Sequence, residues 1–207
     1  MTVSLTNSTV SGNADVAVHI SIEAATLVSN STISGNSGGG IYTDLGAPTG
    51  RSIVVNSTMS DNHMEIWYGG AYIKNTIFKV SSGGHSIVSD GYRVIMSGGY
   101  NISSDDGAGY LNGPGDQINT DPMLGPLRDN GGPTFTHAFL PGSPAINAGD
   151  PNFTPPPDYD QRGPGYDRIR NGRIDIGSFE VQVVPQPSPT PRPRPTRLPR
   201  PRPAPRR

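Results

Sequence analysis

A short motif built around asparagine recurs along the first half of the chain and limits the folds that the chain can adopt. It is clearest at residues 5–13, 28–36 and 54–62, with a weaker copy at residues 73–78. The aligned asparagines, 23, 26 and 19 residues apart, are Asn7, Asn30, Asn56 and Asn75. A unit of roughly 20–25 residues has the length of one solenoid coil. The chain is therefore predicted to wind into about four to five stacked coils.

Apolar residues hold fixed places around each of these asparagines, which indicates strands with an inner and an outer face. One apolar residue lies two positions before each asparagine, and another lies three positions after it; the two sets are Leu5, Val28, Val54 and Ile73, and Val10, Ile33, Met59 and Phe78. Residues 16–22 alternate with period two, as a half-buried strand does. No segment shows a helical period, so we expect an all-β parallel helix whose apolar positions form internal ladders.

The recurrent asparagines are better explained by structure than by ligand binding. In stacked coils equivalent amides lie about 4.8 Å apart and hydrogen-bond to one another up the stack. Asparagine also tolerates the left-handed backbone angles that a tight corner requires. Three of the five Asn-x-Ser/Thr triplets in the chain belong to this repeat, and we interpret them as part of the repeat and not as glycan acceptors.

Composition supports short strands joined by many turns and excludes a disulfide framework. Only 32% of the 207 residues are hydrophobic, 27 are glycine, 22 are proline and none is cysteine. Charge is unevenly distributed, because residues 1–180 hold nine basic and 17 acidic residues, a net charge of −8, while seven arginines follow them. Residues 184–207 alternate proline with arginine, which predicts a disordered, extended tail.

The order of motifs after residue 96 resembles that of the choice-of-anchor Q proteins, a family of exported bacterial proteins. These motifs include Asp121-Pro122-Met123-Leu124-Gly125-Pro126-Leu127, Gly142-Ser143-Pro144-Ala145-Ile146-Asn147, Asp160-Gln161-Arg162-Gly163 and Asp175-Ile176-Gly177-Ser178-Phe179-Glu180. The asparagine repeats also resemble those of polymorphic outer-membrane proteins. The resemblance implies a right-handed parallel β-helix, export to the cell surface and no established catalytic residue.

These observations divide the chain into three regions: coils over residues 1–120, a C-terminal cap of the choice-of-anchor Q type over residues 121–183, and the tail over residues 184–207. A solenoid end exposes unpaired backbone groups and must be covered, so we expect the irregular region to lie over the open end of the helix, with Ile146, Ile176 and Phe179 as buried anchors. The chain begins inside a repeat and without a signal peptide. This start predicts a piece of a longer exported protein that self-associates through its uncapped first coil.

Candidate binding residues are few. Tyr42, Trp67 and Tyr72 are aromatic residues of the coil region that suit a platform for sugars. Asp105, Asp106 and Asp116 form the best acidic group for calcium, although they lack the fixed order of a calcium loop. In the family a calcium-suited run precedes the closing motif, but here it contains Arg168 and Arg170. We expect no other cofactor and identify no catalytic residue; the four histidines are scattered, and His137 is expected to pack.

Three functions fit this sequence. The first is a secreted or surface-exposed scaffold, adhesin-like or glycan-binding, whose partner is a polysaccharide or a cell-wall polymer. The second is a lyase or related enzyme acting on acidic polysaccharides, because parallel β-helices often carry such activities. The third is a nonfunctional fragment of a larger surface protein. We expect no specific nucleic-acid partner, and no apolar run approaches the roughly 20 residues of a membrane span.

Overall fold

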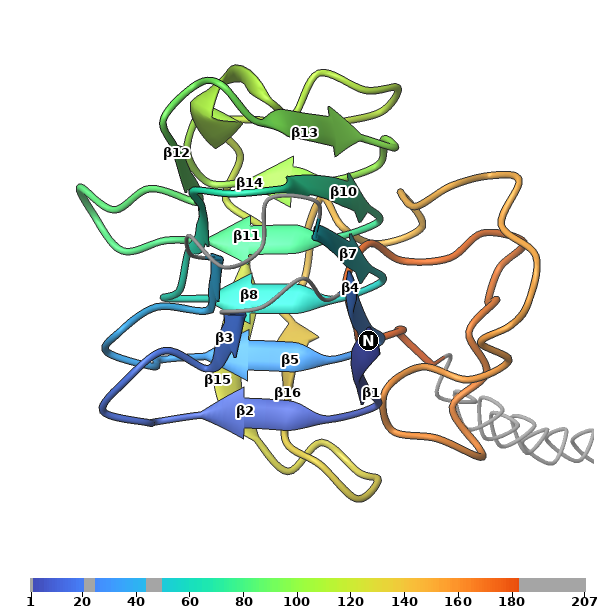
Figure 1. The fold of residues 1–207 in the computed structure, drawn as a ribbon. Helices are drawn as coiled ribbons and strands as arrows, with labels where there is room; N and C mark the ends of the chain where they lie inside the picture. Colours follow the sequence, from blue (N-terminus) through green and yellow to red (C-terminus); the bar gives the residue numbers. More distant parts are fainter. Residues whose placement is uncertain (1, 21–24, 44–49, 183–207) are drawn as a thin grey trace, which may run out of the picture.

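Three parallel sheets wind into a β-helix, and each coil contributes one strand to each sheet (Figure 1). The structure is a computed structural model that describes residues 2–20, 25–43 and 50–182. Sheet A contains β1 (Thr2–Thr6), β4 (Ala25–Ser29), β7 (Arg51–Val55), β10 (Gly70–Lys74) and β13 (Val94–Ser97). Sheet B contains β2 (Thr9–Ser11), β5 (Thr32–Ser34), β8 (Thr58–Ser60), β11 (Ile77–Lys79) and β14 (Ile102–Ser103). Sheet C contains β3 (Val18–Ile20), β6 (Ile41–Thr43), β9 (Met64–Ile66) and β12 (Ile87–Ser89).

Coils 1 to 4 are complete, and β13 and β14 begin a fifth, so the predicted all-β solenoid is confirmed. The asparagines stand at the corner between sheets A and B. Their backbone is left-handed, with φ between 49° and 53° at Asn7, Asn30, Asn56 and Asn75. The amide of Asn30 donates from Nδ2 to Oδ1 of Asn7 across 2.7 Å. The interpretation of these asparagines as structural is therefore confirmed.

The interior of the helix is filled by the apolar ladders that the repeat predicted. Val28, Val54 and Ile73 of sheet A pair in register with one another, as do Ile33, Met59 and Phe78 of sheet B. All six side chains are fully buried. The first-coil members of the two ladders, Leu5 and Val10, are only half-buried.

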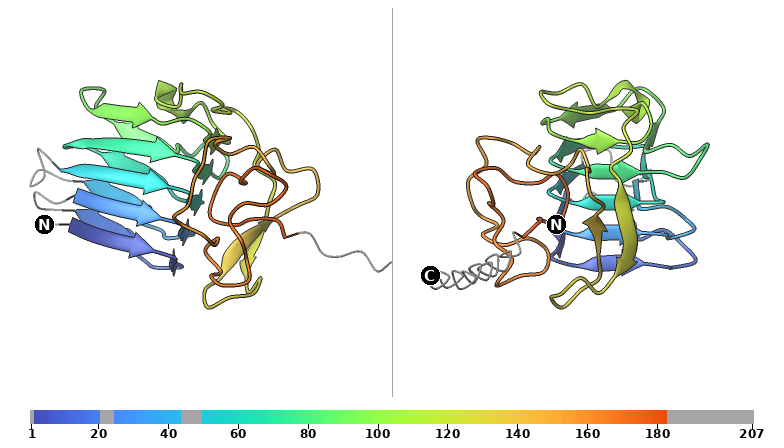
Figure 2. Two further views of the ribbon diagram at one scale, coloured as in Figure 1. Left: turned by 90° about the vertical axis from the view of Figure 1, so that its right-hand side faces the viewer. Right: turned by 180° about the vertical axis from the view of Figure 1, so that it is seen from behind.

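Residues 121–182, which we call the strap, lie along the side of the β-helix (Figure 2). The strap begins with an antiparallel hairpin of β15 (Leu124–Arg128) and β16 (Thr136–Phe139) and continues without regular strands. It contacts one coil after another. The hydroxyl of Thr32 donates to Gln161 Oε1, Ser178 N–H donates to the hydroxyl of Thr58, and Asp150 N–H donates to Asn75 Oδ1.

This placement corrects the expected position of residues 121–180 over the open end of the helix. The physical reason is the outer face of sheet B, where Thr32, Thr58, Ile77 and Ile102 stand in register. These side chains are buried because the strap covers them: Ile176, Ala145 and Leu124 cluster against Ile77 and Ile102. Of the expected anchors, Ile176 and Phe179 are buried and Ile146 is half-buried.

Residues 104–120 were predicted to belong to the coils, but they cover the last coil. A short 3-10 turn, η1 (Gly107–Gly109), leads to Leu111, which is 4% exposed and joins the core cluster of the helix. Tyr110 packs beside it. Residue 183 and the predicted tail, residues 184–207, lie outside the described residues.

Candidate functional site

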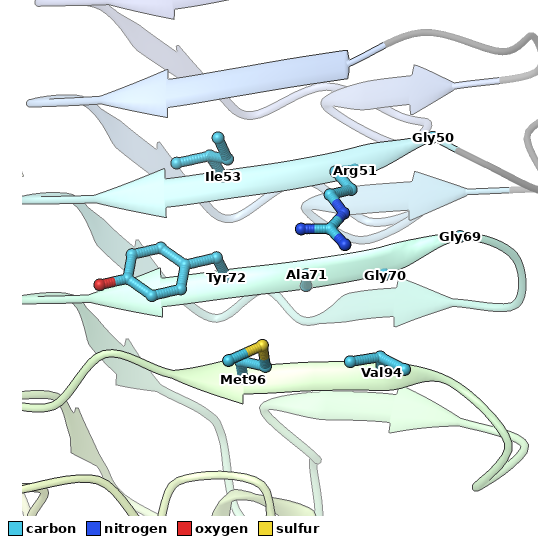
Figure 3. A pocket seen from close by; sticks show the side chains of 9 residues that line it. All are labelled: Gly50, Arg51, Ile53, Gly69, Gly70, Ala71, Tyr72, Val94 and Met96. Carbon is cyan, nitrogen blue, oxygen red and sulfur yellow. The ribbon is translucent and has the colours of Figure 1, made fainter.

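A groove crosses three successive strands on the outer face of sheet A (Figure 3). Its volume is about 520 Å³, and it is lined by Gly50, Arg51, Ile53, Gly69, Gly70, Ala71, Tyr72, Val94 and Met96. Small-molecule sites span roughly 300–1,000 Å³, so the groove has the size of a ligand site. Because stacked strands lie about 4.8 Å apart, the three strands under the groove, β7, β10 and β13, span roughly 10 Å along the helix axis.

One wall of the groove is a column of apolar side chains that point outward. The corner asparagines fix the direction of each strand, so the residue three positions before each of them faces solvent, as Ile53 and Tyr72 do. Tyr72 pairs in register with Ile53 on one side and Met96 on the other. Ile53, Tyr72, Val94 and Met96 are between 36% and 66% exposed. These four side chains form a contiguous exposed apolar surface along the groove.

The hollow of the groove exists because Gly70 interrupts the second outward column. Here Arg51, Gly70 and Val94 stand in register on β7, β10 and β13. A Cβ atom added to Gly70 would lie 2.6 Å from the carbonyl oxygen of Val94, so a side chain at this position would displace the backbone. Arg51 stands at one end of the hollow and Val94 at the other (Figure 3).

The structure does not bring the three candidate aromatic residues together. Only Tyr72 lines the groove. Tyr42 lies on β6 of sheet C, where its ring meets the edge of His19 at a centroid distance of 5.1 Å. Trp67 follows β9, and its indole N–H donates to Glu65 Oε2 across 3.2 Å. The three residues therefore form no common platform.

Sequence reasoning found Tyr72 and missed the other apolar residues of the groove. Ile53 was not singled out, although it lies three positions before Asn56 just as Tyr72 lies three positions before Asn75. Apolar residues at a position that should face solvent were the signal that was available. Met96 and Val94 carried no such signal, because the asparagine motif is absent from their coil.

The carboxylates of Asp105 and Asp116 accept hydrogen bonds from backbone and side-chain groups of the last coils. Asp105 accepts hydrogen bonds from Ser86 N–H and Oγ, Ser103 Oγ and Gly107 N–H. Burial tends to raise the pKa of Asp105, but the bonds from Ser103 and Ser86 outweigh it and hold that pKa below its ordinary value. Asp116 accepts from Asn101 N–H and Nδ2 and from Gly113 N–H.

Asp106 has a third role, because its carboxylate accepts from Ala108 N–H and caps the η1 turn. The lone pairs of Asp105 and Asp116 that calcium would need are thus directed at protein donors. Over residues 2–20, 25–43 and 50–182, no cluster of three or more His, Cys, Asp or Glu side chains is arranged to hold a metal ion. The three acids therefore do not come together as a calcium site in the described structure.

The two closing motifs of the strap meet in a buried cluster of charges. Asp160 and Arg162 come from the first motif, Asp175 and Glu180 from the second, and Arg168 lies between them. Arg162 Nη2 contacts Asp160 Oδ2 at 2.6 Å and also donates to the carbonyl of Glu180. Asp160 accepts from Glu180 N–H, and Asp175 accepts from Val181 N–H. The cluster thereby closes residues 160–181 into a compact unit.

This cluster holds three carboxyl groups and two guanidinium groups, so one proton neutralises it. Burial raises the pKa of Glu180 to about 8, and the carboxylate of Asp175 adds to the shift. Burial likewise raises the pKa of Asp175 above its ordinary value. An arginine stays protonated in a protein, so the proton resides on a carboxyl group. We assign it to Glu180 at neutral pH.

His137 packs, as expected. Its Nε2 lies 2.9 Å from Ser34 Oγ on β5, and its Nδ1 lies 2.7 Å from the carbonyl oxygen of Gly125. Burial lowers the pKa of His137. The neutral ring therefore joins the strap to sheet B through Nε2, and through Nδ1 it links β16 to β15 within the strap.

The described residues include no helix that is long and apolar enough to cross a membrane. Comparisons of the chain with protein-family models, with curated proteins and with solved structures find no match.

Proposed function

We propose that this chain is a binding scaffold of an exported bacterial protein and that it holds an elongated polysaccharide on the outer face of sheet A. The observation that carries the proposal is the groove over β7, β10 and β13. It combines an exposed aromatic ring, a guanidinium group and a floor of glycine backbone within about 520 Å³.

Each part of the groove suits a sugar chain. The ring of Tyr72 offers a flat apolar face for the C–H groups of a sugar ring, and its hydroxyl group offers a polar edge. The guanidinium of Arg51 presents several donors in a fixed fork, which matches sugar hydroxyl groups and, better, a uronate carboxylate. Because Gly70 carries no side chain, the hollow between Arg51 and Val94 has room for a sugar ring.

The lining favours binding over the alternative of a polysaccharide lyase or hydrolase. Hydrolases use a pair of carboxyl groups, and a calcium-dependent lyase uses carboxylates to hold the metal. Among the nine lining residues the titratable side chains are Arg51 and Tyr72, and none is a carboxylate. The residues that the structure brings together thus support recognition of a sugar chain and not its cleavage.

Export and surface attachment rest on the resemblance to the choice-of-anchor Q proteins. The strap contains the two closing motifs of that family, Asp160-Gln161-Arg162-Gly163 and Asp175-Ile176-Gly177-Ser178-Phe179-Glu180. In this structure the two motifs supply four of the five members of the buried charge cluster. The proposed setting is therefore a bacterial cell surface, where polysaccharides and cell-wall polymers are the available ligands.

Binding of the full chain to a panel of immobilised polysaccharides, with calcium and with a chelator, tests this proposal. Acidic and neutral polymers are both included. We expect saturable binding to one class, and loss of the Tyr72 ring in Tyr72→Ala should weaken it by about tenfold or more, as for an aromatic hot spot. Because Asp105 and Asp116 are engaged by protein donors, chelation should leave the affinity unchanged.

Tyr42→Ala is the matched control, because it removes the same side chain from the outer face of sheet C. It should leave the affinity unchanged. All variants retain the seven arginines after residue 180, so attraction of polyanions to that segment cancels in the comparison. Equal affinities of the two variants, or no binding by a folded wild-type sample to any polymer, would contradict a site in the groove.

A further inference from the structure

The strands of sheet A carry no carboxylate, although the body of the chain is acidic. Residues 1–180 hold 17 acidic residues and only nine lysines and arginines. Among the described strands, however, all five of sheet A are free of aspartate and glutamate, and their charged residues are Arg51 and Lys74. Positive charge on one face of an acidic body favours an anionic partner at that face.

Arg51 is the cation of this face that is available to a ligand. Lys74 is engaged, because its Nζ pairs with Asp150 Oδ2 of the strap at 2.7 Å. Of the nine lysines and arginines in residues 1–180, eight form a hydrogen bond or an ion pair with another described residue. Arg51 is the ninth and forms neither within the described part of the chain. Its donors are therefore left for a ligand.

The position of the guanidinium group places these donors inside the groove. It extends from β7 toward β10, where Gly70 carries no side chain (Figure 3). No residue that lines the groove is an aspartate or a glutamate. A ligand carboxylate in the hollow would therefore meet a cation and no competing anion.

The apolar wall of the groove favours a chain of sugar rings as the anionic ligand. A Cβ atom added to Gly98 would collide with the hydroxyl group of Tyr72, so the ring of Tyr72 lies against the backbone of Gly98. Ile53 and Met96 flank the ring in register. A ring held in this way offers a fixed apolar face at a small cost in conformational entropy. A polyphosphate or a polyol phosphate has no sugar ring in its backbone and would leave this face unused.

We propose that the polysaccharide held by the groove is a polyuronate, whose carboxylate binds Arg51 while a neighbouring sugar ring packs on Tyr72. This inference rests on the proposed function and names the class of its ligand. The Cα atoms of Arg51 and Tyr72 are separated by one strand spacing and two residues, roughly 8 Å, so one polymer chain reaches both. Arg51 then determines the preference for acidic over neutral polymers, whereas Tyr72 serves any sugar chain.

A matched pair of polymers tests the role of the carboxylate. Polygalacturonate and the galactan made by reducing its carboxyl groups to alcohols share one backbone and differ in charge. The full chain is titrated with each polymer by isothermal calorimetry. We expect Arg51→Gln to weaken the binding of polygalacturonate by about tenfold or more, the effect of losing a hydrogen-bonded charge pair. The same variant should bind the reduced polymer as the wild type does, because that polymer has no carboxylate to lose.

Arg128→Gln is the matched control, because it removes the same charge from an exposed position on β15, outside the groove. It should leave both affinities unchanged. Both variants retain the seven arginines after residue 180, so attraction of a polyanion to that segment cancels in the comparison. Arg51→Lys keeps the charge and loses the planar fork, so its affinity for polygalacturonate should lie between those of the wild type and Arg51→Gln.

Polyphosphate separates a carboxylate on a sugar ring from a phosphate as the partner of Arg51. It is highly charged and has no ring to pack on Tyr72, so Arg51→Gln and Arg128→Gln should bind it equally. A larger loss of affinity in Arg51→Gln for polyphosphate than for polygalacturonate would assign Arg51 to a phosphate-bearing polymer and overturn the proposal.

Two further results would overturn it. One is equal affinity of Arg51→Gln and Arg128→Gln for polygalacturonate, and the other is a wild type that binds the reduced polymer at least as tightly as polygalacturonate. If Tyr72→Ala still weakens binding in either case, the sugar-binding groove stands and only the class of its ligand is wrong. A folded wild type that binds neither these polymers nor any other polysaccharide contradicts both proposals.

Discussion

At the corners of the coils the backbone is left-handed, and this conformation restricts which residue types can stand there. Asn75 has a φ of 49°, its side-chain oxygen accepts from Asp150 N–H, and its carbonyl accepts from Gly177 N–H. A side chain other than asparagine, aspartate or glycine is disfavoured in this left-handed region. The residue therefore contributes twice, through its backbone and through its contact with the strap.

Two substitutions at this position separate the contributions. Asn75→Gly keeps the left-handed backbone conformation and loses the hydrogen bond from Asp150 N–H. Asn75→Ala loses this hydrogen bond and also disfavours the left-handed conformation. We expect Asn75→Ala to lower the free energy of unfolding by about 1–2 kcal/mol more than Asn75→Gly, the cost of the left-handed backbone. Urea denaturation of the three proteins measures the difference. Equal losses would show that the corner conformation imposes no cost on alanine.

The charge cluster of the strap predicts a dependence of stability on pH. The pKa of Glu180 is raised from 4.5 to about 8 on folding, so the folded state binds an extra proton between these values. Stability is therefore greatest below about pH 4.5 for this group and declines as the pH rises toward 8. At 1.36 kcal/mol for each unit of pKa shift, the loss is roughly 5 kcal/mol as an upper bound.

Glu180→Gln carries no titrating proton and keeps an oxygen for the N–H of Asp175, which Glu180 Oε2 accepts in the structure. The part of the decline in the free energy of unfolding between pH 5 and 8 that Glu180 causes in the wild type should be absent from this variant. Urea denaturation at a series of pH values compares them. Parallel pH profiles of the two proteins would assign the proton to another group.

At the scale of elements, sheet B differs from sheets A and C because both of its faces are buried. Its inner face carries Ile33, Met59 and Phe78, and its outer face carries Thr32, Thr58 and Ile77 under the strap. Ile176 is fully buried against the outer face. The strap is therefore part of the folding unit and not an appendage of the coils.

Truncation of the strap core should be costly. Ile176→Ala removes buried methyl groups and is expected to lower the free energy of unfolding by about 2–5 kcal/mol. Ile169→Ala makes the same change at a strap residue that is 39% exposed, and its effect should stay within about 0.5 kcal/mol. Thermal and urea denaturation measure both. A similar loss for the two variants would mean that the strap does not pack tightly on sheet B.

The coils were predictable from the sequence and the strap was not. The repeat period and the corner asparagines are local signals in the sequence. Residues 5–13 and their copies therefore predicted the strands, the corners and the inward-facing apolar ladders. The strap has no repeat, and its contacts join distant residues, such as Thr32 and Gln161. The strap lies beside sheet B because threonine and isoleucine ladders stand on the outer face of that sheet. The repeat period alone does not distinguish such covered positions from positions that face solvent.

The candidate site was predictable to a similar degree. Tyr72 was identified because it is aromatic, but Ile53, Val94 and Met96 of the groove come from other coils. Arg51, Gly70 and Val94 form one column only because the coils stack in register. Asp105, Asp106 and Asp116 accept hydrogen bonds from backbone donors, and a cluster of aspartates in the sequence does not reveal which donors each one binds.

For the whole molecule, the continuous contact between strap and coils predicts a single cooperative transition. Trp67, the only tryptophan, reports on sheet C, and a cysteine placed by Ala145→Cys reports on the interface of strap and sheet B, where Ala145 is fully buried. Fluorescence and thiol reactivity should give the same unfolding midpoint in urea. Thiol exposure before the fluorescence change would show that the strap detaches first.

The strap also restricts how such a protein can change its length. Solenoids commonly grow or shrink by whole repeats, because each coil contacts only its neighbours. Here Thr32, Thr58 and Asn75, on three successive coils, each meet a particular strap residue. A coil inserted among them would displace the later contacts by about 4.8 Å, one strand spacing. The strap thus acts as a ruler that fixes the number of coils it accompanies, and repeats can be gained without cost only outside its span.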